Sequence, residues 1–196
     1  MSNKKGFTLI ELLVVMGILG ILMAVTILVI NPTEYLKRSR DTQRINDLNA
    51  VSSAIGLAVA NGDDLAPQTV CFATVASTPA IVCNSGASTA PTLGDRTTAG
   101  TAGWIRGVDL SGSLGVLPYD PKNTADMFYL FTSSATGYEL DASMLESAYY
   151  TYGGTSVASA TDGGNANTGA GCTTTVTGSY VSTCKYEVGS NLNLIP

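Results

Sequence analysis

The stretch FTLIELLVVMGILGILMAVTILVI, from Phe7 to Ile30, decides the fold of the chain. Nineteen of its 24 residues are hydrophobic, and Glu11 carries its only charge. As a helix with a rise of ~1.5 Å per residue this stretch is about 36 Å long, enough to cross a membrane hydrocarbon core of ~30 Å. Because its sides are all hydrophobic, the helix suits lipid or the centre of an assembly better than the surface of a soluble domain.

The rest of the 196-residue chain has a different composition. Residues 61–196 hold 11 acidic and 4 basic residues, a net charge of −7 within a whole-chain charge of −5. Leu, Ile, Val and Phe supply 25 of these 136 residues, a fraction typical of a weak hydrophobic core. The negative charge argues against a nucleic-acid partner. The lack of histidine excludes His-based catalysis and His metal ligands, and we expect neither an enzyme nor a cofactor.

Four cysteines compensate for the thin core. Cys71 and Cys83 are twelve residues apart, and so are Cys172 and Cys184. Four cysteines allow three pairings, and the equal short spacings favour two local disulfide bonds. A four-thiolate metal site is the alternative, but the chain lacks the close Cys-x-x-Cys pairs that zinc sites usually show. Disulfide bonds indicate an oxidising compartment outside the cytoplasm.

A short basic stretch precedes the apolar run. An ordinary secretory signal peptide fits poorly, because its apolar core is shorter and ends at a small-residue cleavage site. The sequence KKGFTLIELLVV, residues 4–15, resembles instead the processing and assembly motif of bacterial type IV pilins and type II secretion pseudopilins. The shared features are a short basic leader, a glycine before a phenylalanine, and one acid in an unbroken apolar run.

The resemblance implies roles for three residues. A prepilin peptidase would cut between Gly6 and Phe7 and would N-methylate the new terminus, Phe7. Glu11 would serve subunit assembly by pairing with the N-terminal amine of a neighbouring subunit. An unpaired charge near the centre of a membrane helix costs about 2.5–3.5 kcal/mol, so Glu11 needs such a partner. The alternative is a plain signal-anchor in which Glu11 lies near the membrane interface.

Resemblance and composition together predict an α+β, pilin-like fold in four segments. Residues 1–6 form a leader, 7–30 a hydrophobic transmembrane and polymerisation helix, 31–60 an amphipathic continuation packed on an antiparallel β-sheet, and 61–196 a disulfide-bonded, β-rich extracellular domain. Gly17, Gly20 and Pro32 resemble the positions at which pilin helices kink or unwind. Close packing between helices is an alternative role for the two glycines.

Residues 31–60 carry a helical pattern. Asn31 and Pro32 are typical of a helix start, and Asn61-Gly62 of a helix end. Apolar residues three or four positions apart form one stripe: Ile45, Leu48, Val51, Ile55 and Ala58. Opposite charges lie at ion-pair spacing: Glu34–Arg38, Lys37–Asp41 and Arg44–Asp47. We expect these charges to face solvent or neighbouring subunits.

Short strands and long loops are expected after residue 61. Trp104 to Leu110 is a strand candidate, and residues 127–132 and 138–145 predict a hairpin around a loop at 133–137. Residues 141–147 alternatively begin a short helix. Oxygen ligands gather at Asp120, Asn123 and Asp126 and again in 162–167, but neither group has EF-hand spacing, so we expect turns and no metal.

The basic residues after the apolar run give a conflicting signal. Lys37, Arg38, Arg40 and Arg44 outnumber Lys4 and Lys5, and the positive-inside rule would place the carboxyl side in the cytoplasm. The leader and the cysteines place it outside. We expect a precursor in the cytoplasmic membrane and then an extracellular filament on the cell surface.

The leading hypothesis is therefore a type IV pilin, a subunit of a homopolymeric helical filament. Its partners would be further copies of the chain, the prepilin peptidase, the inner-membrane assembly platform and the cytoplasmic membrane. The two cysteine pairs favour a pilin, because Cys172–Cys184 resembles the disulfide-bounded region of that family. The alternatives are a pseudopilin of a type II secretion or DNA-uptake system, and a membrane-tethered extracellular binding module.

Overall fold

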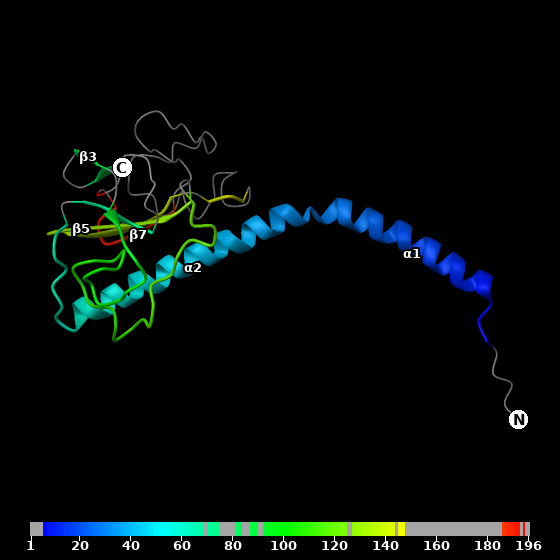
Figure 1. Cartoon of the computed structure of the whole chain (residues 1–196), viewed down its shortest axis with the longest axis horizontal. Helices are drawn as coiled ribbons and strands as arrows, with labels where there is room; N and C mark the ends of the chain where they lie inside the picture. The colour runs from blue at the N-terminus through cyan, green and yellow to red at the C-terminus, as the bar shows by residue number, and fades with distance from the viewer. Residues whose placement is uncertain are drawn as a thin grey trace, which may run out of the picture. The chain divides into compact units, whose positions relative to one another are not determined.

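The computed structural model describes residues 6–68, 70–74, 81–83, 87–89, 92–124, 127–143, 145–147, 186–192 and 194. Two helices come first, α1 (Leu9–Ile30) and α2 (Pro32–Ala60) (Figure 1). The strands that follow are β1 (Phe72–Ala73), β2 (Ile81–Cys83), β3 (Ala87–Thr89), β4 (Thr92–Leu93), β5 (Tyr129–Ser134), β6 (Gly137–Ala142) and β7 (Tyr186–Gly189). The chain divides into two compact units, residues 1–36 and 37–196. The expected α+β class is confirmed.

The two helices meet at Asn31. This residue adopts a left-handed conformation, φ 45° and ψ 73°, and so ends α1. Its carbonyl oxygen accepts hydrogen bonds from the N–H groups of Glu34 and Tyr35, which begin α2. Pro32, at the first position of α2, has no N–H to donate back to α1. The expected helix start at Pro32 is confirmed, whereas α1 continues as a helix through Gly17 and Gly20.

The carboxyl end of α2 also follows the prediction. Gly62, with φ +100°, donates its N–H to the carbonyl oxygen of Val59, and Asp63 donates to that of Ala58. This pair of bonds satisfies carbonyl groups that the helix leaves without partners. Glycine is favoured at position 62 because a side chain is strained at this φ.

Five strands form one sheet in the order β4-β1-β5-β6-β7. The pairs β1–β5, β5–β6 and β6–β7 are antiparallel, and β4 pairs parallel to β1 at the edge. Strands β2 and β3 form a separate antiparallel pair. The predicted hairpin is β5–β6, in which Ser134 pairs with Gly137, so its loop is shorter than expected.

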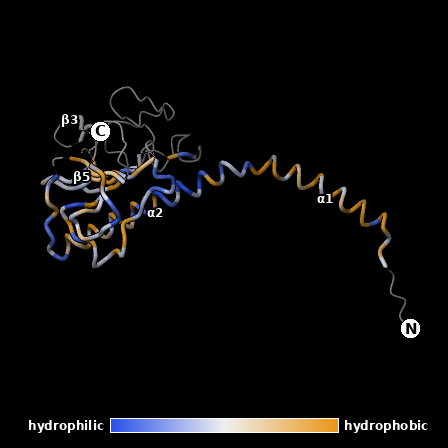
Figure 2. Tube along the Cα trace, in the orientation of Figure 1, coloured by the Kyte–Doolittle hydropathy of each residue, from blue (hydrophilic) through white to orange (hydrophobic). Residues whose placement is uncertain are grey.

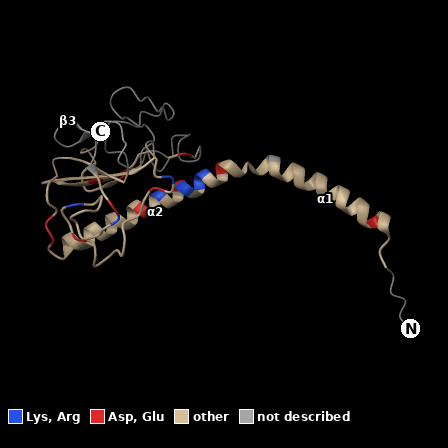
Figure 3. Cartoon of the chain, in the orientation of Figure 1, with Lys and Arg blue, Asp and Glu red and all other residues tan. Residues whose placement is uncertain are grey.

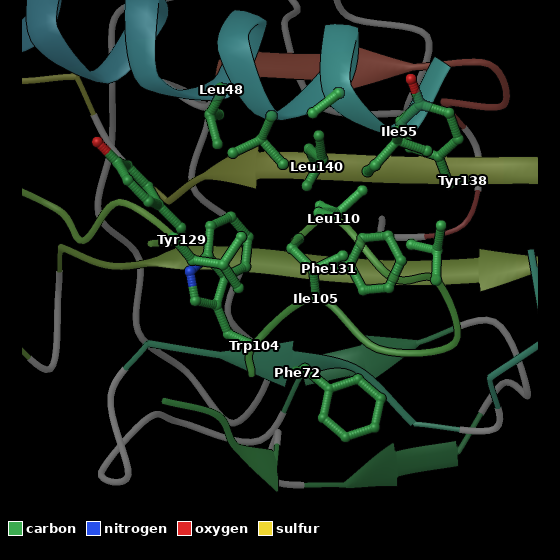
Figure 4. Packing of buried hydrophobic residues seen from close by; sticks show 14 of the residues in the cluster. Leu48, Ile55, Phe72, Trp104, Ile105, Leu110, Tyr129, Phe131, Tyr138 and Leu140 are labelled. Atoms are coloured by element: carbon green, nitrogen blue, oxygen red, sulfur yellow. The ribbon is translucent and has the colours of Figure 1, made fainter. Parts of the chain in front are cut away.

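The predicted stripe of α2 packs on this sheet. Leu48, Val51, Ile55 and Ala58 are buried, and Ile45 is partly buried against the same core. They meet alternate residues of the hairpin: Tyr129, Phe131, Tyr138, Leu140 and Ala142. Figure 4 shows α2 running alongside β6, with Leu48 and Ile55 between the helix and Leu140. Two tyrosine hydroxyl groups of the sheet also hydrogen-bond to α2. The hydroxyl group of Tyr138 pairs with that of Ser52, and the hydroxyl group of Tyr186 accepts from the side-chain amide of Asn49, both at 2.9 Å.

The prediction of a strand over Trp104–Leu110 is wrong. This segment has no strand, although Trp104, Ile105, Val108 and Leu110 are all buried in the core. Its residues do not alternate between two faces, and Gly107 has φ +84°, which turns the backbone away from an extended path. The short helix considered for residues 141–147 is absent from 141–143 and 145–147, and Ala142 ends β6 instead.

Candidate functional site

The start of α1 is organised by Thr8 and Glu11. Thr8 is the N-cap residue, and its Oγ1 accepts a hydrogen bond from the N–H of Glu11 at 3.3 Å. Oε2 of Glu11 in turn accepts from the N–H and the hydroxyl group of Thr8, both at 3.3 Å. This reciprocal capping box places the Glu11 carboxylate at the positive end of the helix dipole.

The surface of α1 is apolar and exposed. In the described part of α1 all side chains are exposed, and Phe7, just before it, is 87% exposed. Figure 2 shows the hydrophobic colour along α1, and Figure 3 shows one acidic position near its start. Leu9–Ile27 is long and apolar enough to cross a membrane. Each buried Leu, Ile or Val side chain is worth ~1.5–3 kcal/mol, so this surface strongly favours lipid or other helices over water.

The sequence of this segment matches a known family. Residues 1–27 match the family described as the prokaryotic N-terminal methylation motif. The amino-terminal segment is pilin-like. The match includes the junction between Gly6 and Phe7 and the acid Glu11, so the resemblance to pilins and pseudopilins is confirmed.

Curated relatives agree with this assignment. A fimbrial protein of Pseudomonas aeruginosa is 35% identical over 65 residues, which are 33% of this chain and 41% of the relative. Fimbrial protein Q of Moraxella bovis is 37% identical over 62 residues, 32% of this chain and 38% of the relative. The chain thus spans about two fifths of the length of the relatives it matches. No solved structure matches the chain significantly.

Beyond the pilin-like segment, a buried ion-pair network joins α2 to the β-rich domain. Its centre is Arg44, whose side chain is fully buried. Nε and Nη2 of Arg44 donate to the two carboxylate oxygens of Asp120 at 2.6 and 3.0 Å. Nη1 donates to Asp41 at 2.6 Å and to Glu146 at 3.2 Å. We call Asp41, Arg44, Asp120 and Glu146 the Arg44 network.

Two further cations complete this network. Arg40 donates from Nε to Glu146 at 2.8 Å, and the ammonium group of Lys122 pairs with the same carboxylate. Burial raises the pKa of Glu146, but bonds from Arg40 and Lys122 and the charge of Arg44 outweigh it and lower that pKa to about 2. Asp41 also accepts from the N–H groups of Glu146 and Ser147, so it holds this loop against α2.

The network corrects the expected pairing of Arg44 with Asp47 and the expectation that the charges of this helix face solvent or neighbouring subunits, since Asp41 and Arg44 are both buried. Arg44 pairs with Asp41, Asp120 and Glu146, and not with Asp47. Asp47 instead accepts a hydrogen bond from the hydroxyl group of Tyr129 at 2.9 Å, which together with burial raises the pKa of Tyr129. Asp120, considered as a calcium ligand, has both carboxylate oxygens engaged by Arg44, and its Oδ1 also accepts from two backbone N–H groups.

The cysteines are partly within the described residues. Cys71 is buried and disulfide-bonded, and Cys83 ends β2, whereas Cys172 and Cys184 lie outside the described residues. The pairing of the four cysteines stays a prediction.

Three buried carboxylates lie close together on β6 and β7. Glu139, Asp141 and Glu187 have oxygen atoms within 4.8 Å of one another. Glu139 accepts a bond from the N–H of Leu194, and all three have further interactions within the chain. Such an acidic group does not by itself define a metal site, and it was not predicted from the sequence.

Proposed function

We propose that this chain is a type IV pilin. It is inserted in the cytoplasmic membrane through α1, cut between Gly6 and Phe7, methylated at Phe7, and assembled into a surface filament in which α1 helices pack together. The segments proposed for this role are the leader 1–6, the helix 7–30, its continuation 31–60, and the extracellular domain 61–196.

The observation that carries the proposal is the joint occurrence of the methylation motif and an exposed apolar helix. A membrane covers α1 before assembly, and the helices of neighbouring copies replace that cover in the filament. In that apolar surrounding the carboxylate of Glu11 needs a cation. The new α-ammonium group of Phe7 on a neighbouring copy supplies one, and the pair neutralises both charges.

Filament formation needs partners outside the chain. A prepilin peptidase is required for the cut, and an inner-membrane assembly platform for extraction of α1 from the membrane. The fimbrial relatives favour a pilus subunit over a pseudopilin of a secretion or DNA-uptake system. Gly17 and Gly20 remain the positions at which α1 would unwind as the helices pack.

The test is the mass of the N-terminal peptide, together with electron microscopy of material sheared from the cells. We expect the mature protein to begin at methylated Phe7 and to be the component of long filaments. A surface protein that still begins at Met1 would show that α1 is only a tether for a binding module.

Glu11→Gln tests the charge of Glu11 separately from its capping role. Glutamine also completes a capping box, so the start of α1 stays intact. We expect cleavage to continue and filament yield to fall by about tenfold or more, because glutamine cannot neutralise the α-ammonium group of a neighbouring Phe7 in the apolar core. Glu34→Gln, on α2, is the matched control and should assemble normally. Normal assembly of the Glu11 variant would overturn the pairing role.

A further inference from the structure

A groove opens beside the carboxyl end of α2. Its volume is about 670 Å³, and it is lined by the last turns of α2, by the segment after that helix, and by the turn between β5 and β6. The apolar part of the lining includes Val59, Leu65, Pro67 and Tyr138. Val59 is 46% exposed, while the hydroxyl group of Tyr138 is held by Ser52 on α2. The groove is therefore apolar and has a fixed wall.

One side of the groove is acidic and one side is open. Asp64 lines it, and Asp63 precedes Asp64 in the exposed segment that follows α2. Gly56 also lines it, and a Cβ atom added there would meet nothing within 4 Å. An occupant that fits must bring apolar side chains for the wall and a positive charge for the acids.

The chain itself contains such a segment at the other end of α2. Tyr35 and Leu36 are 71% and 57% exposed, and Lys37 and Arg38 follow them directly. Figure 3 shows the basic residues concentrated in this part of α2. Among the described residues that follow α1, Tyr35 and Leu36 are the two most exposed large hydrophobic side chains. Apolar and cationic groups thus stand side by side in one helical turn.

This turn cannot reach the groove of its own chain. Arg38 and Ala60 are 22 residues apart in one helix, which separates them by about 33 Å. A second copy has no such restriction. A contact between a groove on one copy and a helical turn on the next is heterologous, so it repeats head to tail and leaves both ends open for further copies.

We propose that the groove at the end of α2 binds the Tyr35–Arg38 turn of a second copy of this chain. Leu36 and Tyr35 cover the apolar wall, and Arg38 pairs with Asp64. The proposal rests on the filament function, and it adds a contact between the β-rich domains to the packing of α1. In a parallel arrangement the two copies in contact are offset by about 33 Å along α2.

A photo-crosslinking residue in place of Ala135, an exposed residue that lines the groove, tests which molecule occupies it. The full chain is expressed in the membrane, illuminated, and digested for peptide mass spectrometry. We expect crosslinks to the peptide that contains Tyr35 to Arg38 of another copy. Crosslinks to a different segment of the chain, to lipid or to another protein, or no crosslink, would overturn the proposal. Because dimers in the membrane give this readout, it does not depend on filaments, whose absence would instead contradict the proposed function.

A charge swap tests the assigned partners. Asp64→Arg and Arg38→Asp should each reduce the crosslink yield by about tenfold, and the double variant should restore it because the opposite charges meet again between copies. Gly56→Trp should block the groove and abolish the contact. Gly115→Trp is the matched control, since a Cβ at Gly115 also meets nothing within 4 Å and lies outside the groove. A double variant as weak as the single ones would refute the pairing of Arg38 with Asp64.

Discussion

Replacing Arg44 by methionine should strongly destabilise the β-rich domain. Methionine keeps much of the side-chain length but removes the charge that holds Asp41, Asp120 and Glu146 together. Arg44 makes four bonds of 2.6–3.2 Å to these carboxylates, and its own side chain is fully buried. Removing one partner of a buried ion pair costs about 3–5 kcal/mol, because charges remain in the interior without compensation.

The expected loss is about 4 kcal/mol of unfolding free energy. The free energy of unfolding of a typical domain is ~5–15 kcal/mol, so the variant should lose a large share of its stability. For 150–250 residues each kcal/mol shifts the melting temperature by ~2–4 °C, which gives a decrease of about 8–16 °C. The assay is thermal unfolding of the full chain in detergent, followed by circular dichroism.

Three comparisons show whether the network causes the loss. Arg44→Lys should be intermediate, because an ammonium group keeps the charge but cannot bond both oxygens of Asp120 as a planar fork. The double variant Arg44→Met, Asp120→Asn should lose less unfolding free energy than the two single variants added together. The difference, which measures the coupling of the two residues, should be at least ~1 kcal/mol. Gln43→Met, exposed on the same helix, should stay within ~0.5 kcal/mol of the original chain. An Arg44→Met variant within ~1 kcal/mol of the original would refute the reasoning.

Two further predictions concern the same domain. The pKa of Glu146 is lowered to about 2 in the folded chain. The ionised carboxylate should therefore stabilise the fold fully above pH ~4.5 and progressively less as the pH falls toward 2. Glu146→Gln should therefore lower the free energy of unfolding by about 2–3 kcal/mol at pH 7. In denaturant titrations near pH 2 the variant and the original chain should have nearly the same free energy of unfolding. An equal difference at both pH values would contradict this prediction. Gly107→Ala should cost about 1–2 kcal/mol, because φ is +84° and the added Cβ would lie 3.0 Å from the carbonyl oxygen of Ala66. Gly112→Ala, with open space around it, is the control, and equal melting temperatures would contradict the strain.

Local patterns predicted the helices and the hairpin because their causes are local. The stripe from Ile45 to Ala58 follows the helical period, and the end of α2 depends on Gly62 and its neighbours. The capping box of Thr8 and Glu11 was not predicted, although it too lies within four residues. These features depend on side chains one helical turn apart, so the sequence contains nearly all of the information.

The Arg44 network was not predictable in the same way. Asp41 and Asp47 both stand three residues from Arg44, so helical spacing alone does not choose between them. The choice follows from Asp120 and Glu146, which are 76 and 102 residues away in the sequence. The strand predicted over Trp104–Leu110 was wrong for a related reason. The burial of this segment without alternation follows from packing against the sheet and not from a local pattern.

The same network bears on the conflicting charge signal at the end of the apolar run. Four cations follow that run, and counted together they favour a cytoplasmic position for the domain. Arg40 and Arg44, however, form ion pairs with acids of the folded domain, Arg44 in its interior and Arg40 partly exposed, so the folded domain accounts for their presence. Lys37 and Arg38 then equal Lys4 and Lys5 in number. The remaining bias no longer opposes an extracellular domain, and Arg38 is also the cation proposed to pair with Asp64 of the next copy.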